Sequence, residues 1–263
     1  MKAFVLNLKR SPNRRAHMTN QLLQADIDYH FLDAVDGTGI DTSDTSLIAA
    51  HWAGRDPSSP RVLGCSLSHI RAYQAIASAH LDVALILEDD VLVPANLNMI
   101  LDQASEHLDQ AEVLLLHLNC PRPPSELSRV GAITLSTGHT LAYPMTFDNI
   151  SGGAAYVVTR EACERLADAL LPVRVPADDW PYFYSQHLVD RIRCAAPLPV
   201  IPSPKFASII SHGAYSWRDH VYHALERVPV PPATTFLAYR RARYYEATRA
   251  VRFVPDTPPY FVN

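Results

Sequence analysis

The segment Val83-Ala84-Leu85-Ile86-Leu87-Glu88-Asp89-Asp90 joins five consecutive apolar residues to three carboxylates. A short apolar run bounded by polar residues is typical of a strand that is buried on both faces, as in a parallel sheet. In open α/β sheets, ligands bind beyond the carboxyl ends of such strands. The three carboxylates are therefore expected at the edge of a sheet where an α/β fold holds its ligand.

Strand and helix patterns alternate on both sides of this segment. Residues 3–8 form another short apolar run, and residues 12–25 begin with proline at the first helical position and continue with apolar residues at helical spacing. Helical patterns over 66–79 and 96–108 flank the central strand, and a further apolar run covers 113–118. This alternation predicts parallel strands joined by crossover helices.

The second half of the chain follows a different pattern. A proline-rich loop follows residue 120, short strands are predicted near 132–135 and over 153–158, and a helix is predicted over 161–170. Four prolines between residues 197 and 204 indicate a loop or a sheet edge. The sequence thus predicts an α/β half followed by a mixed half.

The composition excludes several classes of protein. The 263 residues are 48% hydrophobic and 19% charged, which is ordinary for a globular domain, and the net charge of −4 argues against a nucleic-acid partner. The four cysteines are far apart and match no zinc-finger spacing, so free thiols are expected. No signal peptide and no run of about 20 apolar residues is found, which predicts a cytoplasmic protein.

The carboxylates of Glu88, Asp89 and Asp90 repel one another, and a divalent cation would relieve that repulsion. Alternation along the strand directs Glu88 and Asp90 to one side and Asp89 to the other, so that the three could share a metal and a nucleotide. A solvated turn or a helix cap is the alternative. The sequence contains no H-E-x-x-H, G-x-S-x-G, Walker A or G-x-G-x-x-G motif, which removes the main support for the corresponding enzyme classes.

A second acidic pair, Asp178-Asp179, precedes the aromatic residues Trp180 and Tyr182. Carboxylates beside aromatic rings are suited to holding a sugar, although an aspartate in this position equally suits a helix cap. Gly152 and Gly153 suggest a close approach of the backbone to a ligand, or a simple turn.

Two histidines are of interest. His69 lies within a helical pattern, where a core role or a supporting role is at least as well favoured as catalysis. His212 lies in a late loop and could complete a metal site.

The end of the chain is locally basic. Residues 234–263 contain five arginines against Glu246 and Asp256, and the arginines alternate with aromatic residues. This pattern suits a helix on an anionic membrane surface or a terminal helix docked on the domain.

Taken together, the motifs resemble glycosyltransferase family 25, the bacterial lipooligosaccharide transferases related to collagen galactosyltransferases. The matching segments are 5–15, 64–70, 86–91 and 151–156, in the family's order and spacing. The resemblance covers about residues 1–212 and implies a GT-A-type domain, that is, a Rossmann-like mixed, mostly parallel sheet flanked by helices. Residues 213–263 are then a C-terminal extension.

The resemblance also implies a role for each matched residue. Asp90 would bind Mn²⁺ (or Mg²⁺), with Asp89 beside it and His212 as a late ligand. The residues implied in donor binding are Asn7, Arg14, Glu88, Asp89, Gly152 and Gly153. Asp179 or Asp178 would be the catalytic base. Independently of the resemblance, the aromatic residues Trp180 and Tyr182 beside this pair are expected to contact the acceptor.

The expected activity is an inverting, metal-dependent transfer of a hexose, with UDP-galactose as the expected donor and a lipooligosaccharide or another glycan as acceptor. The extension, through residues 234–253, would hold the enzyme on the inner face of the bacterial inner membrane. Two alternatives remain open: a metal-dependent nucleotidyltransferase, and a catalytically silent relative that binds a nucleotide sugar.

Overall fold

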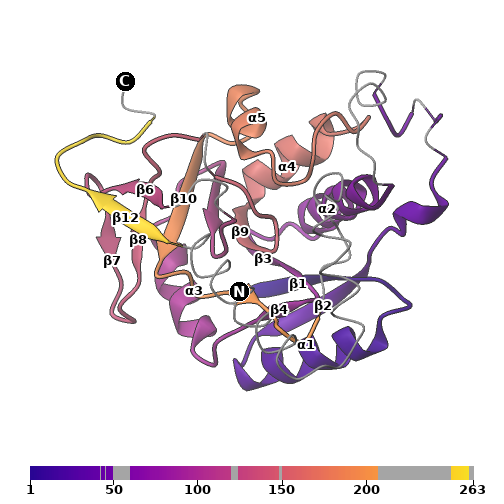
Figure 1. Ribbon diagram of the computed structural model, residues 1–263, viewed down its shortest axis with the longest axis horizontal. Coiled ribbons are helices and arrows are strands. Elements are labelled where there is room, and N and C mark those ends of the chain that lie inside the picture. The colour runs from indigo at the N-terminus through magenta and orange to yellow at the C-terminus, as the bar shows by residue number, and fades with distance from the viewer. Residues whose placement is uncertain are drawn as a thin grey trace, which may run out of the picture.

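The computed structural model describes residues 1–41, 43–44, 46–49, 60–119, 124–147, 150–206 and 250–260. Within these residues an eight-stranded sheet lies between two layers of helices (Figure 1). The strand order is β2-β1-β3-β9-β5-β10-β8-β7. The expected fold class, a mixed and mostly parallel α/β sheet flanked by helices, is confirmed.

The elements have the following bounds. The strands of the main sheet are β1 (Lys2–Asn7), β2 (Asp28–Asp33), β3 (Val83–Glu88), β5 (Glu112–Leu115), β7 (Ile133–Thr134), β8 (Thr140–Ala142), β9 (Ala155–Thr159) and β10 (Arg191–Ala196). The helices are α1 (Pro12–Gln24), α2 (Pro60–Ser78), α3 (Leu97–Ser105), α4 (Arg160–Ala169) and α5 (Trp180–Ser185), with a short 3-10 helix, η1 (Gly37–Gly39). Two further strand pairs are β4 (Val91–Leu92) with β11 (Ile201–Pro202) and β6 (Ser125–Ser128) with β12 (Val251–Val254).

Strands β1, β2 and β3 run parallel, which confirms the predicted direction of β1 and β3. Phe4 in the middle of β1 lies opposite His30 of β2 and Ile86 of β3. The carboxyl ends of β1 and β3 therefore lie at the same edge of the sheet. This edge holds Asn7 at the end of β1 and Glu88 at the end of β3.

Strand β9 is the main departure from the predicted alternation. It lies between β3 and β5 and runs antiparallel to both, while β3 and β5 keep a common direction. Because β9 is reversed, its first residues lie at the edge where β3 ends. The Glu88 amide accordingly donates a hydrogen bond to the Ala154 carbonyl at 2.9 Å.

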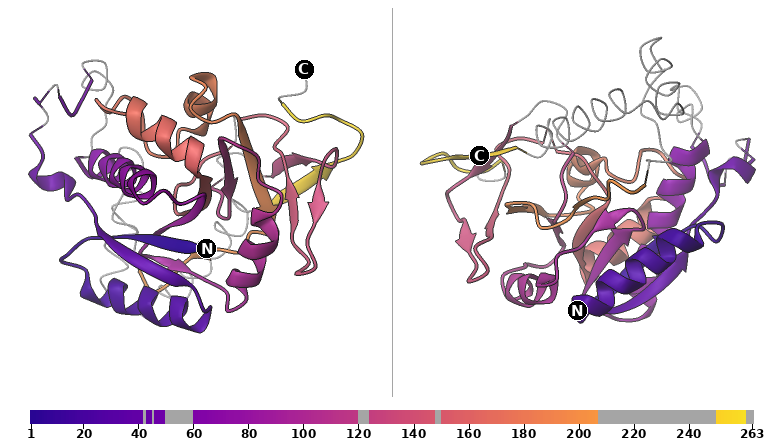
Figure 2. Two further views of the ribbon diagram at one scale, coloured as in Figure 1. Left: turned by 180° about the vertical axis from the view of Figure 1, so that it is seen from behind. Right: turned by 60° about the horizontal axis from the view of Figure 1, so that its bottom comes forward.

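Alternate residues of the central strands fill two hydrophobic cores. Along β1, Ala3 and Val5 face the core that contains α1 and α3, whereas Phe4 and Leu6 face the core that contains α2, α4 and α5. Figure 2 shows these helices on opposite faces of the sheet. Burial on both faces explains why β1 and β3 are almost entirely apolar.

Other boundaries differ from the predicted ones. Helix α2 begins at Pro60, well before the predicted start at residue 66, and β5 ends at Leu115 rather than 118. The segment 197–204 contains β11, which pairs with β4 beside the acidic residues. This agrees with the expectation of a loop or sheet edge.

Most of the predicted extension, residues 213–249, lies outside the described residues. The described end of the chain forms β12, which pairs in parallel with β6, and Phe253 packs against the core. Arg252 makes an ion pair with Glu126 of β6. Residues 251–254 are therefore a docked strand rather than a helix.

We find no helix among the described residues that is both long and apolar enough to span a bilayer.

Candidate active site

An open cleft lies at the edge where β1 and β3 end. Its empty volume, part of which is open solvent, is about 660 Å³. The lining residues come from β1, α1, the loop after β2, α2 and the end of β3: Leu6, Leu8, Arg10, Arg14, Ala34, Val35, Asp36, Gly37, Arg61, Cys65, Ser68, His69, Glu88, Asp89 and Asp90. The sheet thus assembles Arg14 and all three predicted carboxylates in one cleft.

Asp89 is buried and is held from two sides. Its Oδ2 accepts a hydrogen bond from Asn7 Nδ2 at 2.7 Å, and its Oδ1 accepts one from Arg14 Nη1 at 2.7 Å. The Arg14 and Asp89 side chains are only 11% and 9% exposed. Asn7 and Arg14 therefore stabilise the ionised Asp89 carboxylate inside the protein, and Asp89 fixes the turn that follows β3.

Asp90 is less fully compensated. Arg14 Nη1 also donates to Asp90 Oδ2, at the longer distance of 3.2 Å. Burial and the neighbouring charges of Glu88 and Asp89 raise the pKa of Asp90 from 3.8 to about 7, although Arg14 opposes the shift. A carboxyl with this much unbalanced negative charge beside a cleft is suited to a cation.

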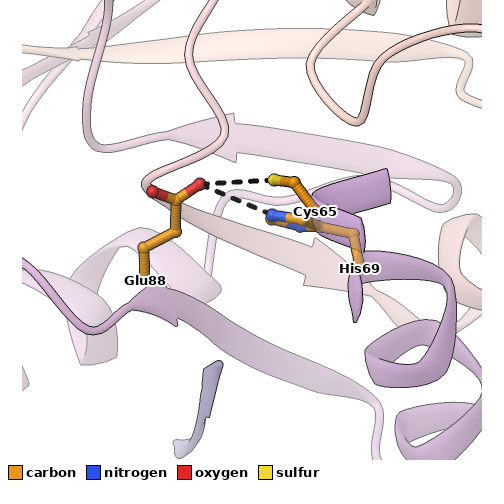
Figure 3. Close-up of side chains that lie close together, drawn as sticks. All are labelled: Cys65, His69 and Glu88. Atoms are coloured by element: carbon orange, nitrogen blue, oxygen red, sulfur yellow. Dashed lines mark hydrogen bonds and ion pairs between the residues drawn. The ribbon is translucent and has the colours of Figure 1, made fainter. Parts of the chain in front are cut away.

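Glu88 faces two side chains of helix α2. Its Oε1 lies 3.7 Å from His69 Nε2 and 3.9 Å from Cys65 Sγ, as Figure 3 shows. Burial raises the pKa of Glu88, but the nearby side chains of His69, His117 and Arg14 together more than offset it, so that the net pKa lies below its ordinary value. These three residues form the Cys65/His69/Glu88 cluster.

His69 is held in place by a tyrosine of β9. It is 1% exposed, and its Nδ1 lies 2.7 Å from the hydroxyl of Tyr156 in β9, which in turn lies 2.7 Å from the hydroxyl of Tyr73. The His69 and Tyr156 rings also stack. This arrangement directs Nε2 toward Glu88 and the cleft.

Gly152, Gly153 and Asp178 meet beside this cluster. The Gly152 amide donates to Asp178 Oδ2 at 2.9 Å. A Cβ atom at Gly153 would lie 3.5 Å from His69 Cε1 and 3.6 Å from Asp178 Cβ. The loop before β9 therefore joins Asp178 to the His69 side of the site.

The structure distinguishes the two aspartates of the second acidic pair. Asp179 is the N-cap of α5, where its Oδ1 accepts from the Tyr182 amide at 3.1 Å. The helix-cap alternative is thus confirmed for Asp179, whose carboxylate stabilises the first turn of α5. Asp178, in contrast, points to the loop that borders the site.

The expected stacking of an acceptor on Trp180 is wrong. Trp180 is fully buried, contacts Tyr156 edge to face and lies within hydrogen-bonding distance of the Gly152 carbonyl, at 3.3 Å from its Nε1. An indole with no exposed face cannot stack on a sugar, so Trp180 supports the Gly152 loop instead. Tyr182 is half-buried, and its ring contacts the ring of Phe183 edge to face. His212 lies outside the described residues.

Sequence reasoning gave too little weight to Cys65 and His69. Cys65 was expected only to be a free thiol, and His69 to have a core or a supporting role. The signal for their joint role is their spacing of four residues, which places both on one face of a helix. Glu88 completes the cluster from another element, and nothing in local sequence predicts that contact.

Comparisons with known proteins identify the family to which this chain belongs. The family model "Glycosyltransferase family 25 (LPS biosynthesis protein)" matches residues 1–180. The chain therefore belongs to glycosyltransferase family 25, and the resemblance inferred from the motifs is confirmed.

Two mammalian relatives illustrate the range of the family. The chain is 25% identical over 195 residues to human procollagen galactosyltransferase 2, an alignment that covers 71% of this chain and 30% of that protein. It is 28% identical over 222 residues to the rat "Probable inactive glycosyltransferase 25 family member 3", covering 76% of this chain and 37% of that protein. The chain thus spans about a third of the length of these relatives.

Among solved structures, a glycosyltransferase involved in glycosylation of the major capsid of PBCV-1 is similar over 73% of this chain and 80% of that chain, with 12% identity and a TM-score of 0.35.

Proposed function

We propose that this chain transfers a hexose from a UDP-sugar to a hydroxyl of a glycolipid or oligosaccharide acceptor, with inversion at the anomeric carbon. The observation that supports it best is the cleft at the ends of β1 and β3, where Arg14 contacts the carboxylates of Asp89 and Asp90. The membership of the chain in glycosyltransferase family 25 supports it as well. Galactose is the proposed sugar because the human relative is named a galactosyltransferase.

A divalent cation of the Mn²⁺ or Mg²⁺ type fits the oxygen ligands of the cleft. Asp90 would hold it, because its carboxyl is 20% exposed and carries unbalanced negative charge. Asp89 is the weaker candidate, since Asn7 and Arg14 already occupy both of its oxygens. When bound, the cation would supply positive charge for the leaving diphosphate.

The protein's own residues would divide the remaining work. Arg14 lines the cleft and carries a fixed positive charge, and we assign Arg14 and Asn7 to the nucleotide side of the donor. Asp178 is preferred over Asp179 as the base that accepts the proton of the acceptor hydroxyl, because Asp179 caps α5. The Gly152 amide would hold the Asp178 carboxylate in position.

The proposal is tested by incubating the purified chain with a panel of glycolipid and oligosaccharide acceptors and with UDP-galactose, UDP-glucose or another UDP-sugar, with Mn²⁺ or with a chelator, and measuring release of UDP. We expect Mn²⁺-dependent release with UDP-galactose and its loss in Asp90→Asn. Asp102→Asn, on the exposed face of α3, is the matched control. Wild-type Mn²⁺-dependent activity in Asp90→Asn would contradict the assignment.

A catalytically silent protein is the second candidate, because the rat relative is named as probably inactive. Such a protein would bind a UDP-sugar, raising its melting temperature, without releasing UDP. A bound ligand at about 100 times its Kd adds about 2.7 kcal/mol to the stability. Binding without turnover, across a panel of acceptors, would favour this candidate.

We further propose that the basic segment before β12, residues 234–249, contacts an anionic membrane surface, since residues 251–253 of the predicted segment are docked on β6. Truncation is a poor test, because it would remove β12 from its pairing with β6. Substitution of Arg240, Arg241 and Arg243 by Gln leaves β12 intact. Unchanged cosedimentation of this variant with phosphatidylglycerol vesicles would argue against the proposal.

A further inference from the structure

The cleft contains a second set of potential metal ligands whose chemistry differs from that of Asp89 and Asp90. We propose that Cys65, His69 and Glu88 form a binding site for a thiophilic divalent cation, with Zn²⁺ as the preferred ion. The site would be separate from the oxygen ligands assigned above to Mn²⁺ or Mg²⁺. The proposal stands whether or not the chain transfers galactose.

The spacing of the three side chains is that of a metal site. The ligand atoms of Cys65, His69 and Glu88 all lie within 4.8 Å of one another. Around tetrahedral Zn²⁺, with bonds of about 2.0–2.3 Å, neighbouring ligand atoms are roughly 3.4–3.6 Å apart. The distances from Glu88 Oε1, 3.7 Å to His69 Nε2 and 3.9 Å to Cys65 Sγ, exceed this spacing by only a few tenths of an ångström.

The ring nitrogen that points into the cluster has no hydrogen-bond partner. His69 Nε2 is completely buried, and among the described residues no group satisfies it, since Glu88 lies beyond hydrogen-bond distance. Leaving a buried polar atom unsatisfied costs about 1–3 kcal/mol. Coordination of a cation at Nε2 would remove that cost.

The other ring nitrogen has the partner that a metal-binding histidine needs. With the proton on Nδ1, His69 donates to the Tyr156 hydroxyl at 2.7 Å, and the lone pair of Nε2 is directed into the cluster. Tyr156 can then donate to the Tyr73 hydroxyl. Such outer partners fix the orientation of ligating histidines.

The combination of ligand types selects the ion. A thiolate and an imidazole favour zinc and similar transition metals, whereas Mn²⁺ and Mg²⁺ favour oxygen ligands. Burial and the Glu88 charge raise the pKa of Cys65 well above its ordinary value, so the thiol is protonated in the absence of metal. Binding of Zn²⁺ would therefore release a proton from Cys65.

Three protein ligands leave one position of a tetrahedral ion open. Cys65, His69 and Glu88 all line the cleft, so this position would be accessible from solvent. Gly153 has no side chain to occupy the space beside His69. A water molecule or a small ligand in the cleft could complete the coordination.

The direct test uses Co²⁺ as a spectroscopic substitute for Zn²⁺ on untagged, metal-free protein. We expect a thiolate-to-cobalt charge-transfer band that added Zn²⁺ abolishes and added Mg²⁺ leaves unchanged. Cys65→Ser is expected to lose this band and to bind Zn²⁺ at least about tenfold more weakly. Cys163→Ser, which alters a buried thiol of α4, is the matched control and keeps the band.

A second measurement needs no variant. Cys65 is partly exposed, whereas Cys163 and Cys194 are buried, so iodoacetamide modification can be followed at Cys65 by mass spectrometry of the native protein. We expect Zn²⁺ to slow this modification and Mn²⁺ to leave it unchanged. Equal Zn²⁺ affinity in wild type and folded Cys65→Ser, or unprotected Cys65 in saturating Zn²⁺, would overturn the proposal.

Discussion

Arg14 in α1 and Asp89 after β3 are 75 residues apart in the sequence and are joined by a hydrogen-bonded ion pair at 2.7 Å. Both side chains are nearly buried, and Asn7 donates to the other oxygen of the same carboxylate. The Arg14–Asp89 pair connects α1 to the turn after β3, and Asn7 connects the end of β1 to the same carboxylate. The geometry of the pair therefore determines where Asp90 lies, and with it the metal site proposed above.

Replacing Arg14 by Met is expected to lower the free energy of unfolding by about 3–5 kcal/mol, because Asp89 is left buried without its partner. Arg15→Met is the matched control: Arg15 is exposed and stacks on Phe31, so its loss is expected to cost about 1 kcal/mol or less. Denaturant unfolding measures both. The double variant Arg14→Met/Asp89→Asn removes both charges of this pair and is expected to regain part of the loss, since Asp90 still lacks Arg14. Equal destabilisation by Arg14→Met and Arg15→Met would refute this account.

The pKa of Asp90 predicts a specific dependence of stability on pH. Its folded-state pKa of about 7 lies above the ordinary 3.8, so the stabilisation from holding the proton is complete at low pH and is lost as the pH rises through about 7. The side chain introduced by Asp90→Asn does not titrate. The free energy of unfolding of this variant, relative to wild type, is therefore expected to rise between pH 5 and pH 8, by on the order of 2–4 kcal/mol. Thermal unfolding at both pH values measures it. A constant difference would show that Asp90 is not the titrating group.

Asp178 and Asp179 are expected to respond differently to substitution. Asp178→Asn is expected to bind UDP-galactose normally and to lose turnover, because the carboxylate is the proposed base. Asp179→Asn keeps a side chain that can cap α5 and is expected to retain both properties, whereas Asp179→Ala is expected to lose about 1 kcal/mol of stability. Donor binding, UDP release and thermal unfolding distinguish these cases. Loss of turnover in Asp179→Asn with normal turnover in Asp178→Asn would reverse the assignment.

Adjacent glycines are expected to differ in their tolerance of a side chain. Gly152 has a φ of +113°, and a Cβ there would lie 3.0 Å from the Asn119 amide nitrogen, so Gly152→Ala is expected to cost at least about 1–3 kcal/mol. At Gly153 the same atom would make ordinary contacts of 3.5–3.6 Å. Gly153→Ala is therefore expected to be neutral or to stabilise by about 0.4–1 kcal/mol. Denaturant midpoints compare the two variants, and similar losses in both would contradict this reading.

Several features followed from the amino-acid sequence by itself. Strands β1 and β3 were predictable because each is a short apolar run buried on both faces, and α1 because it combines a proline at its start with apolar residues at helical spacing. The position of Glu88, Asp89 and Asp90 at the sheet edge followed from their place directly after β3. Membership of glycosyltransferase family 25 followed from the order and spacing of four motifs.

The tertiary structure decided what depends on partners distant in the sequence. Strand β10 was not predicted, because Arg193 interrupts its apolar pattern. In the folded chain Arg193 is buried and paired at 2.8 Å with Glu112, which lies 81 residues earlier in the sequence. The insertion of β9 between β3 and β5, the burial of Trp180 and the meeting of Cys65 and His69 with Glu88 have the same origin. Local patterns determine which residues form an element, whereas strand order and side-chain pairing depend on contacts that only the folded chain brings together.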